Sequence, residues 1–276
     1  MPRKKVKAFL LVLIGLFFFT LTACGKASNR NAYEEIKQSK KIVWGVKADT
    51  RLFGLMSIKT GKIEGFEIDL ANALTKEILG KNGQADFVQT TTKSKIPLLK
   101  NGNIDAVLAA MTITPERKKE VLFTNPYFNA GQSLLVHKNS KIKSIKDLNK
   151  KGMVVLAVKG TTAVANIKKF APKAKTLEYD DYGQAFTALK AHQGEALTTD
   201  SGILAGLAKE SKGYKLVGGN FTSDPYGIAV NKGQTKFASA LNKALTRLRK
   251  NGTYNKLVKK WFGNIPGFDV KYAEKE

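Results

Sequence analysis

A short polar segment at residues 112–117, Thr-Ile-Thr-Pro-Glu-Arg, combines two hydroxyl groups with a guanidinium. A guanidinium is planar and permanently charged, so Arg117 could hold a carboxylate through two parallel hydrogen bonds. Thr112 could add a contact in the same loop, whereas Thr114 could contact the same anion or only cap a helix. The spacing also allows a surface ion pair of Arg117 with Glu116 or Glu120. The segment therefore indicates either an anion site or an ordinary helix start.

Two further segments could bind charged groups. Gly160-Thr161-Thr162 lies between an expected strand and an expected helix, and backbone N–H groups that open a helix form a natural anion site. Asp200 follows another expected strand, where its carboxylate could bind an ammonium group. The simpler interpretation of Asp200 is a helix cap before Ser201.

Alternating strands and helices must position these residues. Periodicity predicts a first block with strands at 42–46, 86–89 and 105–109 and helices at 66–79 and 94–100. A second block follows with strands at 154–158, 176–179 and 195–198 and helices at 162–170, 182–190 and 201–209. Extended segments at 131–137 and 226–230 flank that block, and two amphipathic helices, 237–251 and 254–262, end the fold.

This order predicts an α/β protein with two mostly parallel sheets, in which ligands bind beyond the carboxyl ends of the strands. Because the second block is inserted between two extended segments, two strands would link the lobes and allow hinge closure on a ligand. We expect one lobe to comprise residues 41–129 and 229–276, and the other to comprise residues 130–228.

The N-terminus has the order of an export signal, with four basic residues before an unbroken apolar run at 8–19. That run is short for a membrane span, which needs about 20 apolar residues, although an uncleaved anchor helix is the alternative. Leu-Thr-Ala-Cys at 21–24 resembles the bacterial lipobox, in which the cysteine receives a diacylglycerol. We expect a signal peptide at 1–23, lipidation of Cys24 and a flexible polar tether at 24–40.

The composition excludes several classes of protein. The chain has 47 basic and 22 acidic residues among 276, but the lysines are dispersed without an arginine-rich run or a basic-aromatic ladder. This pattern suits an anionic cell envelope and argues against nucleic acid. A single cysteine excludes an intramolecular disulfide and a cysteine-based metal cluster, so we expect no metal and no cofactor. His137 and His192 stand apart from the polar segments and no nucleophile with its base is evident, so we assign no catalytic residue.

Five motifs, in their order along the chain, resemble the polar amino acid binding proteins of ABC importers, extracellular solute-binding family 3. They are Gly-Phe-Glu-Ile-Asp-Leu at 65–70, Asn-Ile-Asp-Ala at 103–106, Met-Thr-Ile-Thr-Pro-Glu-Arg at 111–117, Phe-Thr-Asn-Pro-Tyr at 123–127, and Tyr-Asn-Lys-Leu with Lys-Trp-Phe-Gly at 254–263. The resemblance extends from about residue 41 to residue 263. It implies a two-lobed, periplasmic-binding-protein-like fold of type II, with two parallel-rich sheets joined by two hinge strands.

The resemblance also implies a function. Such proteins capture an amino acid at the extracellular face of the bacterial cytoplasmic membrane and deliver it to the permease of the importer. We expect a monomer that is held on the membrane by its lipid and that is not an enzyme. A dehydratase on the same fold is the alternative from another functional class.

Residue roles follow from the same resemblance. Arg117 and Thr112 would bind the α-carboxylate of the ligand, and the turn at Thr161 and Thr162 would face it from the other lobe. Asp200 would bind the ammonium group.

The far end of the expected pocket selects the side chain of the ligand. Lys47 and Lys95 match positions near this end in relatives that bind aspartate or glutamate, and two cations in one pocket favour an anion. A lysine is more often exposed, however, and Asp49 could accept hydrogen bonds from a carboxamide. Phe53 is expected as the wall over the ligand, and Tyr226 could place a hydroxyl in the cleft or pack against it. We expect an acidic amino acid, with glutamine as the alternative.

Overall fold

The computed structural model describes residues 31–209, 211–265 and 268–274. From Ala32 onward the chain forms one compact unit. The expected signal peptide and Cys24 lie outside the described residues. Among the residues that are described, no helix is long and apolar enough to cross a bilayer.

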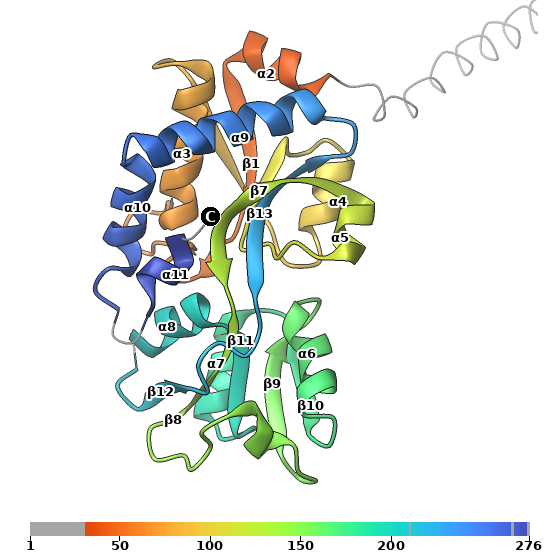
Figure 1. The fold of residues 1–276 in the computed structure, drawn as a ribbon, viewed down its shortest axis with the longest axis vertical. Coiled ribbons are helices and arrows are strands. Elements are labelled where there is room, and N and C mark those ends of the chain that lie inside the picture. The colour runs from red at the N-terminus through yellow and green to blue at the C-terminus, as the bar shows by residue number, and fades with distance from the viewer. Residues whose placement is uncertain (1–30, 210, 266–267, 275–276) are drawn as a thin grey trace, which may run out of the picture. The chain divides into compact units, whose positions relative to one another are not determined.

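Two five-stranded sheets form the framework (Figure 1). The first has the order β5-β1-β6-β13-β7, with β1 parallel to β5 and β6 and with β13 antiparallel to β6 and β7. Its strands are β1 (Lys41–Val46), β5 (Gln84–Gln89), β6 (Ala106–Leu108), β7 (Val121–Ala130) and β13 (Asp224–Asn231).

The second sheet has the order β10-β9-β11-β8-β12, with β9 parallel to β10 and β11 and with β8 antiparallel to β11 and β12. Its strands are β8 (Gln132–His137), β9 (Val154–Val158), β10 (Lys175–Tyr179), β11 (Ala196–Asp200) and β12 (Tyr214–Val217). A small third sheet contains β2 (Asp49–Thr50), β3 (Gly54–Met56) and β4 (Ile63–Glu64).

Helices connect and cover the strands. The connections of the first sheet include α3 (Phe66–Leu79), α4 (Lys95–Lys100) and α5 (Pro115–Glu120), and those of the second include η1 (Ile145–Leu148), α6 (Thr162–Phe170), α7 (Tyr182–Lys190) and α8 (Ser201–Lys209). Beyond β13 follow α9 (Thr235–Lys250), α10 (Thr253–Phe262) and α11 (Val270–Glu274), and α2 (Ala32–Ser39) precedes β1. The expected α/β class with parallel-rich sheets is confirmed.

The core of the first lobe explains why its elements form. The side chain of Trp44 in β1 is fully buried, and its indole Nε1 donates to Thr75 Oγ1 in α3 at 2.9 Å. Phe66, Leu70 and Leu74 are buried on the same helix, one turn apart, which is the period that places apolar residues on one face.

The chain crosses between the two large sheets twice. The first crossing is at Gly131, where any Cβ would lie 2.5 Å from the carbonyl oxygen of Thr222, so only glycine fits. The second lies between Val217 and Asp224, because β13 pairs with β7 from Asp224 onward. This is a few residues before the lobe boundary at 228/229 that we expected from the sequence.

The expected tether at 24–40 is wrong for residues 32–39, which form α2. Ala32 and Ile36 are buried one turn apart, and the ring of Tyr33 stacks on Phe237 of α9 with centroids 6.0 Å apart. The backbone N–H of Ala32 also donates to the side chain of Gln234 at 3.2 Å. Polar composition suggested a linker, but apolar residues spaced four apart were sufficient to dock a short helix.

Candidate functional site

A small polar cavity lies at the carboxyl ends of parallel strands from both large sheets. It is lined by Lys47, Thr92, Lys95, Ala109, Ala110, Thr112, Arg117, Thr161, Thr162, Tyr182, Thr199 and Asp200. These residues end or follow β1, β5, β6, β9, β10 and β11, or begin the helices after them, as expected for α/β sheets. The free volume is about 20 Å³, which is room for about one water molecule, so an amino acid requires the lobes or side chains to move apart.

Arg117 connects the two lobes. Its Nη1 donates to the carbonyl oxygen of Thr112 at 2.9 Å, and its Nη2 donates to the carbonyl oxygen of Gly160 at 3.4 Å. Thr114 caps α5 by accepting from the N–H of Arg117 at 3.2 Å, and it does not line the cavity. The guanidinium therefore reaches the second lobe beside Thr161.

Asp200 is the last residue of β11 and is buried, with 5% of its surface exposed. Tyr226 in β13 donates to its Oδ2, whereas its buried Oδ1 has no hydrogen-bond partner in the described part of the chain. Burial raises the pKa of Asp200 to about 7, and the nearby carboxylate of Asp224 contributes to the rise. The free Oδ1 could accept a hydrogen bond from a cationic ligand group.

The two lysines are buried rather than exposed. The ammonium of Lys47 forms an ion pair with Asp49 Oδ1 at 3.0 Å. The ammonium of Lys95 donates to the carbonyl oxygen of Ala109 at 3.1 Å. Burial, followed by repulsion from Arg117 and Lys47, lowers the pKa of Lys95 well below its usual range. One positive charge is thus already paired, and the other is destabilised.

Thr161 and Thr162 line the cavity where α6 begins. The hydroxyl of Thr161 donates to the carbonyl oxygen of Val158 at 2.7 Å, and that of Thr162 accepts from Gln132 Nε2 at 2.8 Å. Gln132 Oε1 is buried without a partner among the described residues. The threonine hydroxyls are therefore engaged within the second lobe.

Phe53 does not line the cavity. Its ring is fully buried in an aromatic cluster, with centroids 5.2 Å from Phe128, 5.8 Å from Tyr226 and 5.1 Å from Phe262. Tyr182, which the sequence analysis did not select, is the aromatic ring at the cavity, and the ammonium of Lys47 lies 5.7 Å from its centroid. Its position after β10 was the signal that could have identified it.

Glu67 is a second residue that sequence reasoning did not select. It is fully buried in α3, and its Oε1 accepts hydrogen bonds from Tyr127 and, at 2.7 Å, from the N–H of Ala110. Burial raises the pKa of Glu67. Because Ala110 lines the cavity and has a positive φ of 43°, Glu67 holds a strained turn in place.

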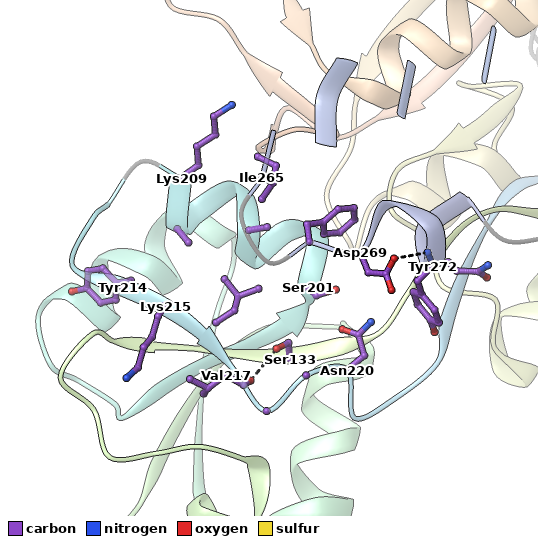
Figure 2. A pocket seen from close by; sticks show the side chains of 17 residues that line it. Ser133, Ser201, Lys209, Tyr214, Lys215, Val217, Asn220, Ile265, Asp269 and Tyr272 are labelled. Atoms are coloured by element: carbon purple, nitrogen blue, oxygen red, sulfur yellow. Dashed lines mark hydrogen bonds between the residues drawn. The ribbon is translucent and has the colours of Figure 1, made fainter. Parts of the chain in front are cut away.

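A larger groove of about 950 Å³ is lined by residues of α8, β12 and α11, among others (Figure 2). Ala205, Leu216 and Phe268 are among the residues that line it, and Ser133 donates to the carbonyl oxygen of Val217 at 3.0 Å. None of the expected site residues lines this groove.

His137 and His192 lie together on the second lobe, with ring centroids 6.0 Å apart, and line neither cavity. Within the described residues, no cluster of His, Cys, Asp and Glu could hold a metal ion.

Residues 42–264 match the bacterial extracellular solute-binding proteins, family 3. The chain belongs to this family. The chain is similar to the ABC transporter glutamine-binding protein of Bacillus subtilis, which is 53% identical over 270 residues, or 94% of this chain and 98% of that protein. The glutamine-binding protein of Geobacillus stearothermophilus is 50% identical over 215 residues, or 78% of this chain and 82% of that protein.

A solved structure supports the fold. An ancestral arginine-binding protein bound to glutamine is 39% identical, with a TM-score of 0.75, and the match covers 82% of this chain and 99% of that one. This family 3 protein is therefore an amino acid solute-binding protein and is not an enzyme. The family resemblance and the two-lobed fold expected from the sequence are confirmed.

Proposed function

We propose that this protein captures glutamine outside the cell and delivers it to the permease of an ABC importer. The observation that carries the proposal is the 53% identity to a glutamine-binding protein over 98% of that protein's length. Glutamine was the alternative from the sequence, and it is now better supported than an acidic amino acid.

The charges at the cavity favour a ligand with a neutral side chain. The sequence suggested two free ammonium groups awaiting an anion, but Asp49 already pairs with Lys47 at 3.0 Å. Burial also disfavours the charged form of Lys95 and lowers its pKa well below the usual range. A second carboxylate beside Asp49 would be repelled, whereas a carboxamide both donates and accepts hydrogen bonds.

The polar groups of the cavity suit the two charges of the ligand backbone. In this proposal Arg117 pairs with the α-carboxylate, assisted by Thr112 and by the N-terminal end of α6 at Thr161 and Thr162. Asp200 accepts hydrogen bonds from the α-ammonium through its free Oδ1. Thr114, Phe53 and Tyr226 act from outside the cavity, by capping α5, filling the core and fixing Asp200.

The proposal extends to the location of the protein. Cys24 would carry the lipid after removal of residues 1–23, which would keep a monomeric binding protein at the outer face of the cytoplasmic membrane.

Calorimetric titration of the purified protein with glutamine, glutamate, aspartate and asparagine tests the ligand. We expect glutamine to bind at least about tenfold more tightly than glutamate, because an unpaired buried charge typically costs more than 1.4 kcal/mol. Tighter binding of glutamate would overturn the choice of glutamine. A lack of binding by all four would mean that the cavity recognises another amino acid.

A matched pair of variants tests the physical reason. Asp49→Asn frees the charge of Lys47, so the preference for glutamine over glutamate should shrink by about tenfold. Asp86→Asn removes an exposed carboxylate that pairs with Lys41 and should leave the preference unchanged. An unchanged preference in Asp49→Asn would show that the ion pair does not select the ligand.

A further inference from the structure

The C-terminal part of the first lobe is strongly basic. Between Asp224 and Asp269 the sequence holds nine basic residues and no acidic residue. Helices α9 and α10 contain eight of the nine. Two of these pair with α3, since Arg247 contacts Glu77 and the ammonium of Lys260 lies 2.7 Å from Asp69 Oδ2.

Three of the four other basic residues of α9 form a line. Lys236, Lys243 and Lys250 are spaced seven residues apart, so they lie on one face of the helix with a rise of about 10.5 Å from each to the next. All three are exposed, and the described part of the chain provides no ion pair for any of them. The opposite face is buried through residues such as Leu241 and Leu248.

This line borders a shallow depression of about 460 Å³ between α2 and α9. Tyr33, Thr235, Lys236, Ser239, Ala240 and Lys243 line the depression, which therefore combines hydroxyl donors with two ammonium groups. Figure 1 shows α2 beside α9, away from the second sheet. On α2 itself, the charge of Lys37 is offset by Glu34 at 2.7 Å.

We propose that this α9 face, defined by Tyr33, Lys236, Ser239, Lys243 and Lys250, binds the anionic phospholipid headgroups of the membrane surface. A row of free ammonium groups with neighbouring hydroxyls is complementary to headgroup phosphates, and lysines near an anionic bilayer are attracted to it. The partner is a lipid surface rather than nucleic acid, because the face lacks a row of exposed aromatic rings for base stacking.

The length of the chain supports the same partner. The inference rests on the proposed lipid at Cys24, and seven residues, 25–31, separate that cysteine from α2. Whatever its conformation, this segment spans at most about 29 Å from Cys24 to Ala32. The start of α2 would thus remain near the bilayer, and α9 packs against α2.

Energy transfer on vesicles tests the proposal. The lipidated protein is reconstituted through its own anchor, with a donor dye on Ser239→Cys and an acceptor on the lipid. Only one cysteine occurs in the chain, so the label is specific. We expect more transfer in phosphatidylglycerol vesicles than in phosphatidylcholine vesicles, and a loss of this difference at high salt. A dye on Asn139→Cys, in the second lobe, should show neither effect.

Matched charge variants complete the test. A triple variant with Lys236→Gln, Lys243→Gln and Lys250→Gln should bind the membrane surface less well. The ratio of molecules with a membrane-bound α9 face to those with an unbound one should fall by about tenfold or more. The same three changes at Lys151, Lys173 and Lys175, exposed in the second lobe, should have little effect. Amino acid binding by both triple variants shows that they are folded.

Three results would overturn the proposal. One is equal energy transfer in neutral and anionic vesicles. Another is an equal loss of energy transfer in the two triple variants. The third is dissociation of the protein from neutral vesicles, which would show that no lipid anchors it. That result would refute the membrane-binding inference but would not affect the proposal that the protein binds glutamine.

Discussion

Asp200 combines burial, a hydrogen bond from Tyr226 and a free carboxylate oxygen. Desolvation disfavours its charged form, and Asp224 adds repulsion. The hydrogen bond from Tyr226 and the charges of Arg117 and Lys95 oppose the rise, which leaves the pKa of Asp200 at about 7. Without ligand, this carboxyl group is therefore about half protonated near neutral pH.

This pKa predicts how affinity depends on pH. A ligand ammonium favours ionised Asp200 and lowers its pKa, so binding below pH 7 requires the loss of a proton. Affinity should be steady above about pH 7.5 and fall as pH drops, approaching tenfold per unit below pH 6. Calorimetry between pH 5.5 and 8.5 measures this slope.

Two variants control that measurement. Asp200→Asn should bind weakly, with little change over the same pH range, because the titrating group is gone. Asp86→Asn removes an exposed carboxylate and should keep the slope of the wild type. A flat profile in the wild type would mean that Asp200 does not meet the ammonium group.

Folding stability should show the opposite trend in the ligand-free protein. The folded pKa of Asp200 lies above the unfolded value of 3.8, so the folded state binds more protons between those values. The contribution of Asp200 to stability is complete below about pH 4 and decreases as pH rises towards 7.

At the scale of elements, α2 shows that a short helix can belong to the folded body. Ile36 is buried with 2% of its surface exposed, and α2 contacts α9 through Tyr33 and Phe237. Helices of eight residues are unstable alone, so packing must hold α2 in place. The membrane-binding face proposed above depends on this packing.

Ile36→Ala should lower the free energy of unfolding by about 2 kcal/mol, through lost apolar burial and a cavity. Glutamine affinity should be unchanged, because no residue of α2 lines the cavity. Urea unfolding measures the change, and Gln38→Ala, at an exposed position of the same helix, is the control. Equal stability of the two variants would show that α2 does not dock.

Several elements escaped prediction because their signals were weak. Strand β7 (Val121–Ala130) contains Pro126, which argues against a strand from sequence alone. Pairing with β13 stabilises it nevertheless. Helix α11 follows the two amphipathic helices that we expected to end the fold, and its Ala273 is buried.

At the scale of the whole molecule, the proposed function has an export signal, a lipid anchor and a binding body act in series. The cavity of about 20 Å³ implies that the body must open before it can load an amino acid. Gly131 lies at one crossing between the sheets, where the backbone of Thr222 leaves no room for a side chain. Opening there would separate Arg117 from its contact with Gly160 in the second lobe.

If Cys24 carries the lipid as proposed, Cys24→Ser should leave a protein that binds its amino acid but is shed or stays as a precursor, because the anchor is lost and the described fold contains no cysteine. Fractionation of cells into membrane and medium, with antibody detection, measures the change. Ser28→Ala, in the same segment, should stay with the membrane. Membrane retention of processed Cys24→Ser would contradict the lipid anchor.

The sequence by itself determined the alternation of strands and helices, the polar loop of Arg117 and the carboxylate at Asp200, because periodicity and residue type are local properties. Only the tertiary structure decided that Lys47 pairs with Asp49, that Phe53 lies in the aromatic core and that Glu67 supports Ala110. The physical reason is that burial and charge pairing depend on contacts between segments far apart in the chain. Such contacts set whether a lysine is free to hold an anion, and therefore which side chain the pocket favours.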